Sequence, residues 1–282
     1  MAETGAAVGR CADVSRGTHS PDRRRVPRET SAGRDAPVWE RVCYSSPMMD
    51  ASAEIAEGLA AMGIVATDQQ LRALSLHLEL VAEANTAFNL TAISEQQSVR
   101  LHVLDSAAAL PQLFAAPAGE FADIGSGAGF PGVTLAILSG RPATLVESVK
   151  KKAAFLERVV ARLRLKAAVR GIMAEELALE RPAAFAAVTA RALSALPSLV
   201  ELASPLLRTE GLLICLKGAP ELGELSRGDA AARRCGMKRV ETATVAVPGV
   251  DAQRTVVVYR RGATAGVTLP RRSGMAQRRP LA

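Results

Sequence analysis

The sequence predicts an α/β fold with a mostly parallel sheet that is covered by helices on both faces. After Pro117, short apolar runs alternate with segments of helical period, as in sheets built from strand–helix repeats. A glycine-rich loop follows the first of these runs, where such sheets bind ligands. Two β-rich runs flank a Pro-Gly turn at 248–249 and predict a closing hairpin, whose antiparallel strand we expect at the sheet edge.

Residues 1–47 differ in composition from the rest of the chain. They are rich in Arg, Ser, Gly and Pro and lack a sustained hydrophobic period, so we expect a disordered N-terminal extension. Two alternatives stay open. One is a transit peptide, against which the six acidic residues of this segment speak. The other is a translation start at Met48 or Met49, where the helical pattern begins.

Residues 48–116 predict a helical extension ahead of the sheet. A T-x-x-Q capping box at 67–70 precedes a helix with one apolar face, and we expect His77 on the surface of this helix. A turn at 88–93 leads to a second helical stretch over 95–110.

Residues 117–262 predict the core that contains the sheet, and residues 263–282 a basic C-terminal tail. The predicted strands are 120–124, 142–147, 167–171, 184–189, 211–217, 238–247 and 253–260, and the predicted helices are 131–139, 150–164, 194–208 and 220–234.

Positive charge is concentrated at the C-terminal end. The formal net charge is +7, and the seven arginines from Arg254 onward, with no acidic residue among them, account for all of it. A neutral body with a basic end is typical of a protein that binds a polyanion. A solvated tail without a partner is the alternative.

The four cysteines, at 11, 43, 215 and 235, show neither C-x-x-C pairing nor metal-ligand spacing, which fits a reducing, cytoplasmic compartment. Cys215 lies in an apolar run that predicts a buried strand. No apolar run approaches the roughly 18 residues of a membrane span. We therefore expect a monomer with no membrane partner and no metal ion.

The glycine loop FADIGSGAGFPG, 121–132, matches two cofactor patterns. From Gly127 it is G-x-G-x-x-G, typical of dinucleotide-binding folds; from Asp123 it is D-x-G-x-G-x-G. The Asp123 carboxylate would repel a pyrophosphate, but it suits the sulfonium and ammonium groups of S-adenosyl-L-methionine. Glu147, at the end of the second strand, is placed to bind ribose hydroxyls of either cofactor. The loop therefore favours S-adenosylmethionine, and a nicotinamide-dependent oxidoreductase is the alternative.

Seven stretches together resemble one family, RsmG or GidB, the bacterial 16S rRNA guanine-N7 methyltransferases. In chain order they are NLTAI (89–93), RLHVLDS (100–106), the glycine loop, MAEEL (173–177), VTARAL (188–193), LLICLKG (212–218) and LPRRSGMAQRRPL (269–281). The resemblance covers about 49–281. It departs from the family at Ala186, where Asp is usual, which weakens any role for that carboxylate.

The resemblance implies a class I S-adenosylmethionine-dependent methyltransferase fold, Rossmann-like, with a seven-stranded mostly parallel sheet and an N-terminal helical extension. It implies methyl transfer to N7 of a guanine in the 530 loop of small-subunit rRNA. The implied cofactor contacts are Gly125, Phe130, Glu147, Ala174, Glu175 and Arg191, to which the loop pattern adds Asp123 and Gly127.

Catalytic acids, bases and metal ligands are not expected, because guanine N7 already has an in-plane lone pair and carries no proton. The candidate contacts to 16S rRNA or the small ribosomal subunit are Arg100, His102, Lys150, Lys151, Lys152, Lys217, Arg271 and Arg272. Three lysines at a helix start oppose the helix dipole, which favours a phosphate-binding role. The alternatives are a class I methyltransferase acting on a small molecule or protein, and an RNA-binding assembly factor without activity.

Overall fold

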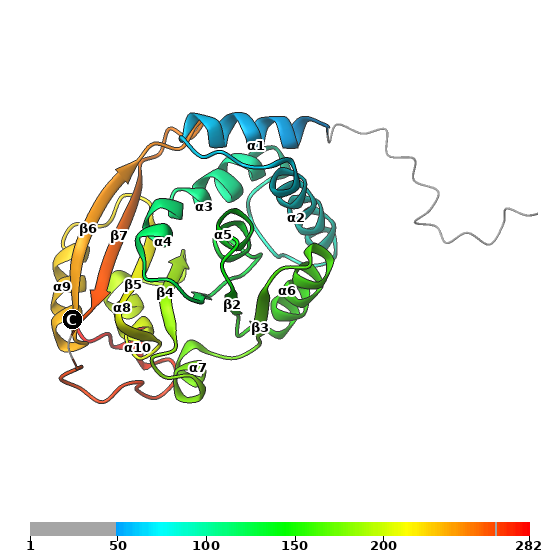
Figure 1. The fold of residues 1–282 in the computed structure, drawn as a ribbon. Coiled ribbons are helices and arrows are strands. Elements are labelled where there is room, and N and C mark those ends of the chain that lie inside the picture. Colours follow the sequence, from blue (N-terminus) through cyan, green and yellow to red (C-terminus); the bar gives the residue numbers. More distant parts are fainter. Residues whose placement is uncertain (1–48, 263) are drawn as a thin grey trace, which may run out of the picture. The chain divides into compact units, whose positions relative to one another are not determined.

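Seven strands form one sheet in the order β3-β2-β1-β4-β5-β7-β6 in the computed structural model, which describes residues 49–262 and 264–282 (Figure 1). The strands are β1 (Phe121–Ile124), β2 (Ala143–Val146), β3 (Ala167–Arg170), β4 (Phe185–Arg191), β5 (Leu207–Lys217), β6 (Met237–Val245) and β7 (Arg254–Arg261). The order reverses between β1 and β4, which creates a crevice at the carboxyl edge of the sheet. The expected Rossmann-like class I methyltransferase fold is confirmed. The expected extension over 1–47 lies outside the described residues.

The position of β7 corrects one expectation. β7 pairs antiparallel with both β5 and β6, so it lies inside the sheet and β6 forms the edge. Its residues Val256, Val257, Val258 and Tyr259 are all buried, whereas the side chains of β6 after Met237 are exposed or partly buried. A continuous apolar run needs cover on both faces, which an interior strand has.

The helices are α1 (Met49–Ala61), α2 (Asp68–Ala87), the 3-10 turn η2 (Glu95–Gln97), the π-helix η3 (Val99–Leu104), α3 (Asp105–Ala107), α4 (Leu110–Ala115), α5 (Gly132–Ser139), α6 (Lys150–Leu163), α7 (Ala174–Glu180), α8 (Leu196–Ala203), α9 (Glu224–Arg234) and α10 (Met275–Arg278). The capping box at Thr67 and Gln70 is confirmed at the start of α2. The expected helix over 95–110 is instead four short helical segments. α7 and α10 were not expected from the sequence pattern.

Alternate residues of the strands enter two separate hydrophobic cores. In β5, Leu212, Ile214 and Leu216 face one core, and Leu213 and Cys215 face the other. The first core is completed by α1 to α6 and the second by α7 to α10. The strand period of two thus assigns every second side chain to each layer of helices.

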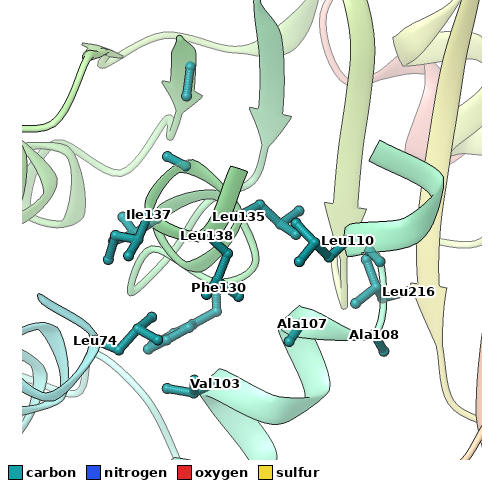
Figure 2. Close-up of a cluster of buried hydrophobic side chains, with 14 of the residues drawn as sticks. Leu74, Val103, Ala107, Ala108, Leu110, Phe130, Leu135, Ile137, Leu138 and Leu216 are labelled. Carbon is teal, nitrogen blue, oxygen red and sulfur yellow. The ribbon is translucent and has the colours of Figure 1, made fainter. Parts of the chain in front are cut away.

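The helical extension packs directly on the sheet-containing core. Figure 2 shows Leu74 of α2 and Val103 of η3 around Phe130, with Leu135 and Leu138 of α5 beside them. These side chains are at most 8% exposed. All described residues fall in the compact unit Ser46–Ala282, so the contacts run across position 117 without a break.

Arg141 ties the end of the extension to the first strand. Its guanidinium donates hydrogen bonds to the carbonyls of Leu113 (2.6 Å), Pro117 (2.7 Å) and Gly119 (2.9 Å). The Leu113 carbonyl belongs to the last turn of α4, and those of Pro117 and Gly119 lie between α4 and β1. The last carbonyls of a helix have no partner within the helix, and Arg141 supplies one.

We expect Arg141→Ala to lower the free energy of unfolding by about 2 kcal/mol, because three carbonyl acceptors lose a charged donor. Urea denaturation measures this change. Arg208→Ala is the matched control: Arg208 donates to the Ala118 carbonyl from an exposed position, and its loss should change stability by less than about 0.5 kcal/mol. Equal effects of the two substitutions would contradict the role assigned to Arg141.

Candidate functional site

A cavity opens at the carboxyl edge of the sheet, beside the reversal of strand order. Its lining includes Gly125 after β1, Ala174 and Glu175 at the start of α7, Leu193 after β4 and Gln277 of α10. The cavity thus brings together three predicted cofactor contacts, Gly125, Ala174 and Glu175, that are up to 50 residues apart in the chain. Its volume of about 50 Å³ is well below that of pockets that enclose a nucleoside-sized ligand, so the cavity alone does not enclose such a ligand.

Asp123 lies beneath the glycine loop rather than in the cavity. The carboxylate is fully buried and accepts hydrogen bonds from Thr189 Oγ1 (2.7 Å) and the Gly132 amide (3.2 Å). Burial raises the pKa of Asp123 to about 6 despite these hydrogen bonds. A Cβ at Gly132 would lie 2.6 Å from Asp123 Oδ2, so only glycine fits there. The carboxylate of Asp123 therefore fixes the loop, and its direct contact with a cofactor stays a prediction.

Glu147 joins the glycine loop to the β2–α6 connection. Its Oε2 accepts from the Gly127 amide at 2.9 Å, and its Oε1 accepts from the Val149 amide at 2.8 Å. The pair of contacts orients a carboxylate at the end of β2 and explains why Gly127 and Glu147 lie together. Each oxygen keeps a second lone pair for a hydroxyl donor.

Phe130 is stacked between two imidazole rings of the helical extension. The ring centroid of His77 lies 4.5 Å away and that of His102 4.2 Å away, nearly parallel. His77 is fully buried and its Nε2 donates to the Ala128 carbonyl at 2.9 Å, so the expectation of a surface position is wrong. The cause is a tertiary contact that the helical period does not reveal.

His102, a predicted RNA contact, is likewise buried, with 3% of its surface exposed. Arg191 Nη2 donates to Nδ1 at 3.2 Å, so the proton is on Nε2, which donates to Thr91 Oγ1 at 3.2 Å. Burial, followed by the charge of Arg191, lowers the pKa of His102 to about 3. Burial lowers the pKa of His77 to about 4. Both rings that hold Phe130 are therefore neutral at physiological pH.

Arg191, a predicted cofactor contact, is fixed at the end of β4 by the extension. It donates from Nη1 to Asp105 Oδ2 (2.7 Å) and to the Leu101 carbonyl (2.6 Å), and its Cζ lies 5.6 Å from the Phe130 ring centroid. Arg254 of β7 occupies the other oxygen of Asp105 at 2.6 Å. One carboxylate thus holds two guanidinium groups beside the glycine loop.

Several predicted RNA contacts lie on the surface. Lys150 and Lys151 are exposed and Lys152 is half-buried in the first turn of α6, which contains no acidic residue. Arg272 is exposed, and Arg100 is half-exposed with its Nε 2.9 Å from Glu54.

Two other predicted RNA contacts are bound within the protein. The Lys217 ammonium lies 2.8 Å from Glu224 and 3.3 Å from the Ser194 carbonyl. Arg271 forms a two-pronged ion pair with the buried carboxylate of Glu201. To contact RNA, either cation would have to share or give up a buried carboxylate partner, so both assignments stay predictions.

The C-terminal segment also contributes residues that were not among the predicted cofactor contacts. The Gly274 amide donates to Glu175 Oε1 at 2.8 Å, and Gln277 borders the cavity. The arginines around them dominate the sequence pattern, which indicates only a basic tail. Within the described residues, no cluster of His, Cys, Asp and Glu could hold a metal ion. In the same part of the chain, no helix is long and apolar enough to cross a membrane.

Comparisons with known proteins agree on one family. The family model described as rRNA small subunit methyltransferase G (GidB) matches residues 70–256. Three similar relatives bear the name Ribosomal RNA small subunit methyltransferase G. That of Symbiobacterium thermophilum is 36% identical and covers 83% of this chain and 100% of its own. Those of Pelotomaculum thermopropionicum and Cupriavidus necator are 34% and 37% identical, covering 80% and 74% of this chain and 97% and 94% of their own.

We expect Phe130→Leu to lower the free energy of unfolding by about 2 kcal/mol, because two stacked ring pairs are lost while apolar volume is largely kept. Phe114→Leu is the matched control, since Phe114 is 59% exposed and should change stability by less than about 0.5 kcal/mol. Guanidinium denaturation of both variants measures the difference. A Phe130→Leu effect no larger than the control would contradict the stack.

We expect His77→Gln to flatten the rise of stability with pH between about 4 and 6.5. Unfolding returns the pKa of His77 from about 4 to 6.5, so the unfolded chain binds a proton that the native protein excludes, and stability increases with pH in this window. In the middle of this window, the slope of the free energy of unfolding against pH should fall by up to ~1.4 kcal/mol per pH unit in the variant. Asp123 has the opposite effect in both proteins, because its raised pKa makes the native state bind the extra proton.

Urea denaturation at intervals from pH 4 to 8 tests this expectation. The difference between the two proteins at pH 8 measures lost packing alone, and the decrease of this difference at lower pH measures proton binding. If the free energies of unfolding of the two proteins change in parallel with pH, the native protein allows His77 to bind a proton, which contradicts the expectation.

Proposed function

Because the chain belongs to the GidB family of small-subunit rRNA methyltransferases, we propose that it transfers a methyl group from S-adenosyl-L-methionine to N7 of a guanine in the 530 loop of 16S rRNA. The family membership makes the chain a methyltransferase. The cofactor, the base and the methylated atom are the proposal. Its main structural support is the cavity that joins Gly125, Ala174 and Glu175 at the reversal of strand order.

The carboxylates around the cavity suit a nucleoside without phosphate. Glu175 lines the cavity and Glu147 lies at the base of the neighbouring loop, and both offer carboxylate oxygens to ribose hydroxyls or to an adenine amine. Among the described residues that line the cavity, none is basic. A pyrophosphate would meet carboxylates and find no counter-charge there. This argues against the nicotinamide alternative.

When bound, S-adenosylmethionine supplies an electrophilic methyl group on a sulfonium. Guanine N7 attacks through a lone pair that needs no deprotonation, so the residues of this chain have to align the reactants and exclude water. The loop from Gly125 to Phe130 has the rigidity for this task, because Asp123, Glu147 and the two imidazoles hold it from below and from the side. Arg191 offers a fixed positive charge at the same edge.

The exposed cations supply the contact to RNA. Lys150, Lys151 and Lys152 lie where β2 leads into α6, at the same sheet edge as the cavity, and Arg100 and Arg272 add further positive charge. Phosphate contacts of this kind weaken with salt. With few aromatic side chains, the enzyme recognises the shape of folded RNA or of the small ribosomal subunit rather than stacked single-stranded bases. It acts as a monomer in the cytoplasm, where its substrate lies.

We expect incubation with radiolabelled S-adenosylmethionine and small ribosomal subunits from cells lacking the gene to label one nucleotide. Chemical cleavage at N7-methylguanine should place that nucleotide in the 530 loop. Subunits from cells that contain the gene are the control and should accept no label, because their site is already methylated.

Two results would overturn this proposal in different ways. Label at another atom or another base would reject the position but retain an rRNA methyltransferase. Cofactor binding without transfer to subunits or naked rRNA would favour the alternative, a class I methyltransferase for a small molecule or protein.

A further inference from the structure

We propose that the tail segment, residues 269–281, is part of the cofactor site rather than an arm that binds RNA. In this assignment Gly274 and Gln277 are positioning residues for the nucleoside end of the cofactor. The inference rests on the proposed use of S-adenosylmethionine and specifies which residues complete its pocket.

The tail segment is anchored by a buried carboxylate. Glu201 of α8 is 3% exposed and accepts from Arg271 Nε (2.6 Å), Arg271 Nη2 (2.7 Å) and the Leu281 amide (3.3 Å). Ala276 and Leu281 are buried in the same core as α8. A two-pronged pair on a buried carboxylate holds a segment in one position, and it also neutralises the charge of Arg271 that an RNA phosphate would need.

This anchor brings the Gly274 amide to Glu175. Gly274 has φ = +80°, a conformation that favours glycine, and its N–H donates to Glu175 Oε1 at 2.8 Å. Glu175 is 5% exposed and lines the cavity. The contact fixes the orientation of the carboxylate and leaves Oε2 as the acceptor for a donor in the cavity, of which the amine of adenine is one.

Gln277 closes the same cavity from α10. It contributes to the lining together with Ala174 and Glu175, whereas Arg271 and Arg272 are absent from the described lining. In this proposal the amide side chain of Gln277 lies against the nucleoside end of the bound cofactor. Loss of the Gly274 and Gln277 contacts should therefore weaken cofactor binding and leave RNA binding nearly unchanged, whereas the exposed Arg272 stays available to RNA.

Isothermal titration of the full chain with S-adenosylhomocysteine and with adenosine tests the proposal. We expect Arg271→Ala to weaken both ligands about tenfold, equivalent to ~1.4 kcal/mol, and Gln277→Ala to weaken both by a common factor of about three to ten. Arg272→Ala is the matched control, since its exposed side chain is outside the cavity lining, and it should bind both ligands as the unmodified chain does. For a 16S rRNA fragment we expect the reverse: Arg272→Ala should weaken binding more than Arg271→Ala or Gln277→Ala does.

Each outcome decides one question. If Arg271→Ala and Gln277→Ala keep their affinity for both ligands within about twofold while RNA binding falls, the tail segment is an RNA arm and the inference is wrong. If Arg271→Ala does not fold, Gln277→Ala decides alone, because this exposed side chain is not part of either core. If the unmodified chain binds neither ligand, the proposed cofactor fails, whatever the variants do.

Discussion

A single carboxylate, Asp105, joins the three parts of the protein that meet beside the glycine loop. It lies in α3 of the extension and pairs with Arg191 at the end of β4 and with Arg254 at the start of β7. Because Asp105 is buried, loss of one guanidinium partner would leave buried charge poorly compensated. The pairing places Arg191 over Phe130 and beside His102, whose neutral state is due first to burial and second to the charge of Arg191.

Local sequence signals predicted the strands, the capping box at Thr67 and the position of the glycine loop, because each depends on neighbours within a few residues. The errors concern long-range contacts. His77 follows a helical pattern that suggests exposure, but Phe130, 53 positions later, covers it. Arg271 lies in a basic stretch and Lys217 at the end of an apolar one, but Glu201 and Glu224 reach them only in the folded chain. Charge counts do not distinguish a paired cation from a free one.

The two carboxylates that bind the glycine loop, Asp123 and Glu147, have different structural roles that the sequence motif does not reveal. Asp123 points into the protein and shapes the backbone, and Glu147 holds the loop at its outer edge. Both were assigned to the ligand, Asp123 because its charge suits a sulfonium and an ammonium group and Glu147 because it ends the second strand. Burial separates them: Asp123 has no exposed surface, whereas Glu147 keeps 7%.

The shared core of extension and sheet has a consequence for the order of events during synthesis. The extension leaves the ribosome first, yet Leu74 and Val103 find their partners only when Leu135 and Leu138 of α5 have been made (Figure 2). Until then its apolar faces remain open to solvent or to chaperones. The nascent extension therefore cannot bury its apolar faces until the sheet segment has been synthesised. Slow translation of residues 121–138 would prolong the time during which the extension can aggregate.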